Sequence, residues 1–347
     1  MKRFLTAILL CALALGLLVS CGGAGSDRSV NLFIWSEYMP QEVLDDFEAE
    51  TGIKVNITTF GSIADMYAKV KSSPAGTYDL IDAAGFYVKR LIDEGKLDKI
   101  DFSNVPNAQN IAEGYKNQNF DPDNEYSVPY LGGVATICVN TARVTEPITS
   151  YADLFRPEYE KSIVIIDDFR VIIGAINLML GFGYDEADPQ KLEQTKAKLL
   201  ELKPNIKVID GDSPKTYMIN GETTLGIIYS AEIAIAMEEN PDVEVVYPAE
   251  GQYLFFDSLC IAKDSKNKAE AEKFLDYILR PEVGKKIVDI FPYTSPNDAA
   301  AALLGEDYLG NSAKNIPATA VAKGYNPVDL DTDTLQIYND IWTEFTK

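Results

Sequence analysis

The segment NLFIWSEYMP (residues 31–40) joins an apolar run to a helix start through a short polar turn. Residues 32–35 predict a buried strand, because consecutive apolar residues suit a strand that is covered on both faces. Ser36 is the predicted N-cap, and Pro40 suits the first turn of the helix predicted over residues 42–47. A strand that leads into a helix in this way predicts the first unit of an α/β fold.

The turn after this strand carries the first candidate binding residues: Trp35, Ser36, Glu37 and Tyr38. In open α/β sheets, residues just beyond the carboxyl end of a strand border the ligand crevice. Taken alone, this turn has an alternative interpretation without a binding role: Trp35 and Tyr38 are packing residues and Glu37 is a solvated surface residue.

The alternation of strand and helix continues along the chain, with turn residues between the apolar runs. Further strands are predicted at residues 52–59, 78–82, 134–140, 163–166, 225–229 and 254–262. Helices are predicted at residues 63–70, 86–92, 171–180, 190–202 and 230–237, and the chain from Ala269 onward is expected to be largely helical. This rhythm predicts an α/β protein, and the length of 347 residues allows two core-forming domains.

Residues 1–20 are predicted to be a secretory signal peptide, because two basic residues precede an apolar run that ends at Val19. The run is too short for a comfortable membrane span. Leu18-Val-Ser-Cys21 resembles the lipobox of bacterial lipoproteins, so Cys21 is the predicted lipidation site and residues 21–28 the lipidated start and flexible tether. The body would then lie in the periplasm or at the cell surface, anchored to a membrane. A plain signal peptide is the alternative.

Composition narrows the function classes. The chain contains no histidine, which removes Ser-His-Asp and Cys-His catalysis and most catalytic zinc sites. A glycosidase built on two carboxylates remains an alternative. The net charge of −22 argues against nucleic acid as a partner and fits a cationic ligand.

No cofactor or metal is expected. The sequence has no phosphate loop, and Asp121, Asp123 and Glu125 mimic a calcium loop but have Tyr126 where the glycine is needed. Asp329, Asp331 and Asp333 lack that glycine too. Both acidic runs are interpreted as turns or solvated faces.

Cys138 and Cys260 are the cysteines of the body, and both lie in apolar, strand-like runs. They are predicted to be small buried hydrophobic residues. The alternative is a disulfide between them if their strands are adjacent, because the protein is predicted to be exported.

The order of these segments resembles that of the polyamine (spermidine and putrescine) binding proteins of bacterial ABC importers, over nearly all of the mature chain. The segments that carry the resemblance are Trp35-Ser-Glu-Tyr38, Thr51-Gly-Ile-Lys-Val55, Tyr78-Asp-Leu80, Val128-Pro-Tyr130, Tyr151-Ala-Asp-Leu-Phe-Arg-Pro-Glu-Tyr159, Phe255-Phe-Asp-Ser-Leu259 and Ser295-Pro-Asn297.

The resemblance implies a two-lobed, periplasmic-binding-protein-like (type II) α/β fold, with a hinge and a ligand cleft between lobes that close on the ligand. By similarity, lobe 1 is residues 29–134 plus 256–300, and lobe 2 is residues 135–255 plus 301–347. The hinge crossings would lie near residues 134–135 and 255–256.

The family's binding positions map onto this sequence residue by residue. Besides the first turn, the resemblance implies ligand-binding roles for Phe86, Asp168, Tyr229, Glu232, Phe255, Asp257 and Tyr293. Glu232 matches an acid of the putrescine-preferring branch. The chain departs from the family at Val171, where glutamate is common, at Gly211, where serine is common, and at Pro327, where a polar residue is expected.

This set suits a polyamine on physical grounds. A polyamine needs separated carboxylates for its ammonium groups and an apolar or aromatic slot between them. Because Val171 leaves fewer acids for a long triamine, putrescine, alone or with spermidine, is the predicted ligand. The protein is expected to be a monomeric, non-catalytic binding protein that delivers its ligand to an ABC permease. The alternatives are another small amine, ferric iron, or a surface lipoprotein without a transport role.

Overall fold

The strand and helix predicted around Trp35 are present in the computed structural model, which describes residues 28–347. Strand β1 (Ser29–Trp35) is covered on both faces, and α2 (Gln41–Thr51) follows it. The prediction of Ser36 as the N-cap is wrong, because the helix begins five residues later with Pro40 at that position. The Ser36 N–H instead donates to the Phe60 carbonyl at 3.1 Å, which fixes the turn to the neighbouring strand.

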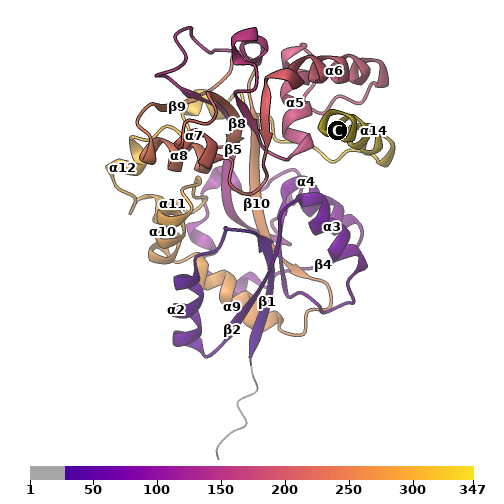
Figure 1. Cartoon of the computed structure of the whole chain (residues 1–347). Helices are drawn as coiled ribbons and strands as arrows, with labels where there is room; N and C mark the ends of the chain where they lie inside the picture. The colour runs from indigo at the N-terminus through magenta and orange to yellow at the C-terminus, as the bar shows by residue number, and fades with distance from the viewer. Residues whose placement is uncertain (1–27) are drawn as a thin grey trace, which may run out of the picture.

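The strands form one sheet in the order β2-β1-β3-β10-β5-β8-β6-β7, with β4 beside β10 and β9 beside β5. Its strands are β1, β2 (Lys54–Phe60), β3 (Leu80–Ala84), β4 (Leu97–Asp98), β5 (Ser127–Asn140), β6 (Ile163–Ile165), β7 (Ile206–Ile209), β8 (Leu225–Tyr229), β9 (Val243–Val246) and β10 (Tyr253–Ala262). The sheet runs through two stacked lobes, and β5 and β10 cross from one lobe to the other (Figure 1). The predicted two-lobed α/β fold is confirmed.

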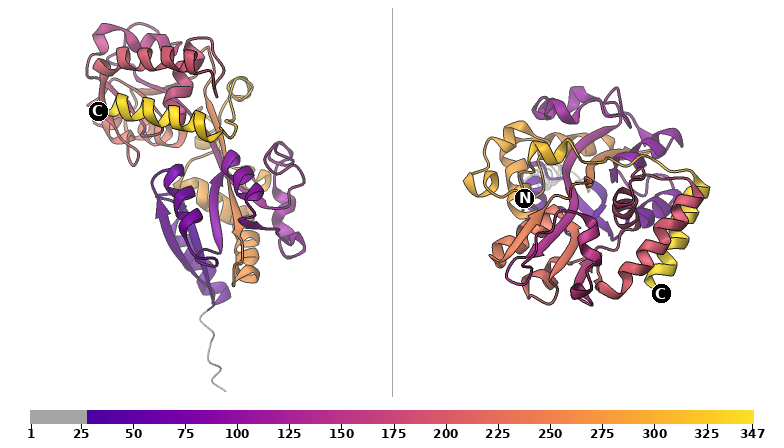
Figure 2. Two further views of the ribbon diagram at one scale, coloured as in Figure 1. Left: turned by 90° about the vertical axis from the view of Figure 1, so that its right-hand side faces the viewer. Right: turned by 90° about the horizontal axis from the view of Figure 1, so that it is seen from above.

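The helices cover the sheet in both lobes, and the views in Figure 2 show α14 at the C-terminus packed on the outside of the second lobe. They are α2, α3 (Ile63–Ser72), α4 (Gly85–Asp93), α5 (Phe169–Met179), α6 (Pro189–Leu202), α7 (Lys215–Ile219), α8 (Ser230–Glu239), α9 (Lys268–Ile278), α10 (Pro281–Ile290), α11 (Asp298–Ala301), α12 (Glu306–Leu309), α13 (Ala318–Val321) and α14 (Thr332–Thr346). The sequence did not predict β7, β9 or α7, which are short and only partly apolar. No helix within residues 28–347 is long and apolar enough to cross a membrane.

The crossing strand β5 is longer than predicted. The sequence suggests a start at residue 134, because Pro129 and two glycines precede it, but pairing begins at Ser127. Asp257 and Ser258 of β10 pair with Leu131 and Pro129, so Tyr130 is the extra residue of a bulge in β5. Pro129 borders this bulge, where a missing N–H is tolerated. At Ala135, β5 pairs with both β10 and β8, so the same strand serves both lobes.

Each lobe has its own hydrophobic core. Two clusters lie on opposite faces of β1 in the first lobe, and a third cluster surrounds β6, β8 and α5 in the second. The segment limits given above for the lobes stay a prediction, and Leu304 and Tyr308 pack with the first-lobe residues. The predicted signal peptide and lipidated Cys21 lie outside the described residues.

The cysteines and the acidic runs have structural roles. Cys138 and Cys260 are buried free thiols. Although their strands are adjacent, Cys260 lies opposite Ser127, far along β5 from Cys138, so no disulfide forms. The Asp121 carboxylate accepts the backbone N–H groups of Glu125, Tyr126 and Ser127, which shapes the turn before β5.

Candidate functional site

A cavity of about 190 Å³ lies between the lobes, next to a wider groove of about 560 Å³ that shares Trp35, Asp168 and Tyr229 with it. The carboxyl ends of β1, β6 and β8 border it, as expected for an α/β crevice. All the residues that the sequence proposes for the site line this cavity except Phe86. They are Trp35, Ser36, Glu37, Tyr38, Asp168, Tyr229, Glu232, Phe255, Asp257 and Tyr293.

Asp257 forms one acidic end of the cavity. It lies on β10 with 5% of its surface exposed, and its Oδ2 accepts the Tyr38 hydroxyl at 3.0 Å. The Tyr38 carbonyl in turn accepts the Tyr130 hydroxyl at 2.6 Å, which holds the turn in place. Burial raises the pKa of Asp257 well above the usual carboxyl range, and the Tyr38 hydrogen bond opposes part of that rise.

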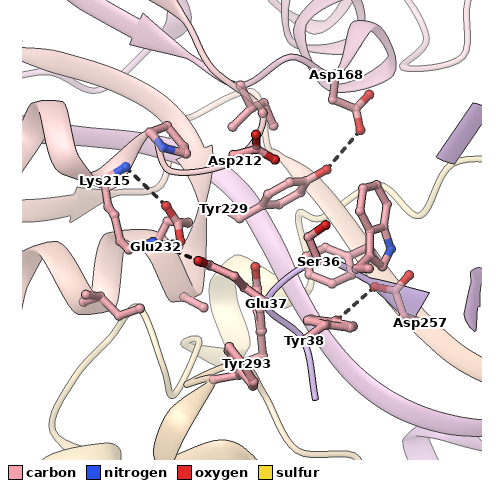
Figure 3. A pocket seen from close by; sticks show the side chains of 18 of the residues that line it. Ser36, Glu37, Tyr38, Asp168, Asp212, Lys215, Tyr229, Glu232, Asp257 and Tyr293 are labelled. Atoms are coloured by element: carbon pink, nitrogen blue, oxygen red, sulfur yellow. Dashed lines mark hydrogen bonds and ion pairs between the residues drawn. The ribbon is translucent and has the colours of Figure 1, made fainter. Parts of the chain in front are cut away.

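Asp168 provides a second carboxylate at the N-terminus of α5. Its Oδ1 accepts the backbone N–H groups of Arg170 and Val171 at 2.9 and 3.3 Å, so it is a helix cap. Its Oδ2 faces the cavity and accepts the Tyr229 hydroxyl at 3.0 Å (Figure 3). Burial raises the pKa of Asp168, and the hydrogen bond from Tyr229 and those from the helix backbone oppose the rise.

An aromatic wall connects these two acids. Tyr38 packs edge-to-face on Tyr293, Tyr293 on Phe255 and Phe255 on Tyr229, with ring centroids 5.4, 5.7 and 5.5 Å apart. The first tyrosine donates to Asp257 and the last to Asp168. The site therefore presents a carboxylate with its own tyrosine at each end of an apolar wall.

A third acidic group is already occupied by a cation of the chain itself. The Lys215 ammonium lies 2.7 Å from Glu232 Oε1 and 3.8 Å from Glu37 Oε2. Figure 3 shows this pair on the opposite side of the cavity from Asp257. Burial raises the pKa of Glu232, and Lys215 opposes that rise. Glu37 is exposed and has a φ of +50°, a conformation that costs a non-glycine residue free energy.

The structure places Phe86 outside the cavity. Its ring lies 5.0 Å from the Arg170 guanidinium, in a cation–π contact between α4 and α5. Helix α4 starts at Gly85, which packs so closely on Phe120 that a Cβ there would lie 2.4 Å from that ring. This close approach fixes the start of α4 and directs Phe86 toward α5.

Sequence reasoning missed Lys215, Asp212 and Tyr253, which also line the cavity. Lys215 follows Ser213-Pro214, which is a helix-start signal. A helix predicted to start there would have made Lys215 a candidate for the crevice. Sequence reasoning also missed Asp82, an acidic residue in the middle of the apolar strand β3, which is fully buried and lies diagonally across from Asp257 of β10.

The three departures from the family pattern have different locations. Gly211 lines the cavity. Val171 is buried in the second-lobe core. Pro327 lines neither the cavity nor the adjoining groove. Asn339 and Trp342 of α14 line that groove.

Comparisons with known proteins agree on one family. The model for "bacterial extracellular solute-binding protein" matches residues 42–318. The chain is 35% identical over 335 residues to the spermidine/putrescine-binding periplasmic protein of Salmonella typhimurium, covering 96% of each. It is 27% identical to the putrescine-binding periplasmic protein PotF of Escherichia coli, covering 99% of this chain and 97% of that one.

A solved structure gives the same result. The spermidine/putrescine ABC transporter substrate-binding protein PotD of Streptococcus pneumoniae matches with a TM-score of 0.79 and 32% identity, over 92% of this chain and 98% of that one. These similarities cover both lobes and the cavity between them.

Proposed function

The chain belongs to the family of bacterial extracellular solute-binding proteins, and we propose that it binds a polyamine and delivers it to an ABC permease. We propose putrescine as the preferred ligand, bound one-to-one by a monomer. Two of the named relatives are periplasmic proteins that bind spermidine/putrescine or putrescine, and the third is the substrate-binding protein of a spermidine/putrescine ABC transporter.

The observation that carries this proposal is the pair of tyrosine-bonded carboxylates at the ends of one aromatic wall. A buried ammonium needs an anionic or hydrogen-bonding partner, and Asp257 and Asp168 each offer one. The aliphatic chain between two ammonium groups would lie along the aromatic rings. Each cation–aromatic contact contributes ~0.5 to 2 kcal/mol.

Lys215 supports a diamine over a triamine. A third ammonium needs a third acid, and Glu232 already holds the Lys215 ammonium at 2.7 Å. A triamine would have to displace Lys215, or place its third charge near a group that is already neutralised. Asp257 and Asp168 are the two enclosed carboxylates of the cavity without a lysine or arginine ion pair among the described residues, and they match two ammonium groups.

Ferric iron is less well supported by this geometry. Iron-binding sites of this kind use deprotonated tyrosines, and burial raises the pKa values of Tyr38, Tyr229 and Tyr293 well above the usual phenol range. Two of the three hydroxyls are also committed as donors to carboxylates.

Isothermal titration calorimetry of residues 22–347 with putrescine and spermidine tests the function. The protein is first unfolded and refolded to remove ligand carried through purification. We expect tight one-to-one binding that is stronger for putrescine and is lost in Asp257→Ala. The exposed variant Asp45→Ala serves as the control. Absence of binding to both amines by the wild type would refute the proposal.

We also propose that residues 1–20 are removed as a signal peptide and that a lipid on Cys21 anchors the protein to a membrane. The lipobox-like Leu18-Val-Ser-Cys21 and the Gly-rich residues after it support this. Labelling cells with an alkyne fatty acid should mark the wild type and leave Cys21→Ser unmarked. Equal labelling of both proteins would contradict the lipidation.

A further inference from the structure

Asp82 is a buried carboxylate with no charged partner. It lies in the middle of β3 and is 0% exposed, and no hydrogen bond of ordinary geometry reaches either of its oxygens within residues 28–347. The backbone N–H groups of Trp35 and Ala83 are its nearest polar neighbours. Within residues 28–347 neither Asp82 nor Asp257 forms an ion pair with a lysine or arginine. A buried, unpaired carboxylate is costly, so its presence in an otherwise apolar strand calls for a physical cause.

The strand register places Asp82 beside Asp257. Ala84 pairs with Asp257 and Asp82 pairs with Leu259 across β3 and β10. Because alternate residues of a strand share one face, both carboxylates lie on the same face as diagonal neighbours. Asp257 lines the cavity and Asp82 lies behind it.

The other ionisable groups around the pair are neutral. Tyr38 lies beside it from the turn after β1, Tyr130 from β5, Tyr253 from β10 and Tyr293 from the segment after α10. Cys260 is near Asp82 but lies on the other face of β10. Burial raises the pKa of each, so none supplies a charge at neutral pH. Burial also raises the pKa of Asp82, the charge of Asp257 raises it further, and the backbone N–H groups of Trp35 and Ala83 oppose part of the rise.

We propose that Asp82 and Asp257 act as one acid pair that shares a proton in the empty cavity and releases it to solvent when a ligand ammonium binds beside Asp257. Two neighbouring carboxylates in a dry site cannot both be ionised without a cation. The ammonium supplies that cation, so the pair can carry its full negative charge only in the complex. The inference rests on the proposed amine ligand and adds Asp82 as a positioning residue that acts through Asp257.

The affinity for putrescine should therefore rise with pH. Release of one proton per ligand corresponds to about a tenfold gain in affinity per pH unit below the pKa values of the pair. Calorimetry of the wild type, Asp82→Asn and Asp82→Leu from pH 5 to pH 8, at each pH in two buffers that differ in ionisation enthalpy, measures this slope and the protons released. Both variants should show a shallower slope and fewer protons released. The exposed variant Asp93→Asn should match the wild type.

Equal slopes and equal proton release in the wild type and both Asp82 variants would overturn the inference. Failure of the wild type to bind either amine would instead refute the proposed function. In that case, infrared spectroscopy of the unliganded protein tests whether Asp82 and Asp257 share a proton, without the need for a ligand. A protonated-carboxyl band at neutral pH that disappears in Asp82→Leu supports the shared proton, and its absence from the wild type overturns it.

Discussion

Single residues set the charge of the cavity, and Lys215 is the clearest case. Its ammonium lies between Glu232 and Glu37, where a ligand cation would otherwise bind. The sequence makes Glu232 a candidate ligand anchor, and the structure pairs it with a lysine from another helix. The number of free acids therefore depends on a contact between α7 and α8.

Replacing Lys215 should shift the ligand preference. In Lys215→Met, Glu232 is freed for a third ammonium, and a charge-assisted hydrogen bond contributes ~1.5 kcal/mol, or about tenfold in affinity. We expect the affinity for spermidine to rise about tenfold relative to putrescine, measured by calorimetry. Lys207→Met, at an exposed lysine outside the cavity, should leave the ratio unchanged. A ratio unchanged in Lys215→Met would contradict the role of this lysine.

Asp82 should also affect the stability of the unliganded protein. Its folded-state pKa is raised above that of an unfolded carboxyl, so the native state binds more protons than the unfolded state. Its contribution is fully present below about pH 4 and is lost as pH rises through the folded-state pKa. In Asp82→Asn the melting temperature should decline less over this range, with on the order of 1 kcal/mol more stability at neutral pH. Parallel melting curves for the two proteins would count against a buried titrating group.

At the scale of elements, the crossing strands β5 and β10 bring the two lobes and the cavity together. Gly132 and Gly133 of β5 lie opposite Phe256 and Phe255. A Cβ at Gly133 would lie 2.9 Å from both the Phe255 ring and the Ser230 hydroxyl. The absence of a side chain there allows the Phe255 ring to take its place in the aromatic wall.

Gly133→Ala should therefore damage both stability and binding. Overpacking of this size costs ~1 to 3 kcal/mol, and moving the Phe255 ring opens the wall between the two acids. Chemical denaturation and calorimetry should show both losses. Gly114→Ala is the matched control, because nothing lies within 4 Å of a Cβ there. If Gly133→Ala keeps the stability and the affinity of the wild type, the prediction is wrong, because β5 then accepts the added methyl group without loss of free energy.

At the scale of the whole molecule, the cavity has walls from both lobes. Asp257 and Tyr38 come from segments that pack with the first-lobe core, whereas Asp168 and Tyr229 come from α5 and β8 of the second. A ligand that bridges Asp257 and Asp168 gains both contacts only when the lobes are close together. Its binding should therefore shift the protein toward a closed state.

Small-angle X-ray scattering can measure this closure. The radius of gyration should fall when saturating putrescine is added to the ligand-free wild type, and it should stay constant for Asp257→Ala, which lacks one anchor. Size-exclusion chromatography in parallel tests the proposed monomeric state with and without putrescine. Full binding without any change in the radius would argue against closure.

The sequence by itself determined the layout of the chain. Apolar runs such as residues 32–35 and turns such as Trp35 to Tyr38 are local patterns, so they predicted the α/β units and the first turn of the cavity. The family resemblance added six further residues that line it. The wrong predictions also came from local patterns. Ser36 was predicted as a helix cap, and Pro129 led to a predicted start of β5 that is too late. In each case pairing with a neighbouring strand overrode the pattern: Phe60 of β2 accepts the Ser36 N–H, and β10 pairs with β5 on both sides of the bulge at Tyr130.

The tertiary structure alone decided how the charges combine. Asp82 and Asp257 are far apart in sequence and become neighbours only through the pairing of β3 with β10. Lys215 reaches Glu232, and Tyr229 reaches Asp168, only because separate elements of the second lobe converge on the cavity. Burial and Coulomb energy depend on distance in space, and distance in space between remote residues is fixed by packing and strand register.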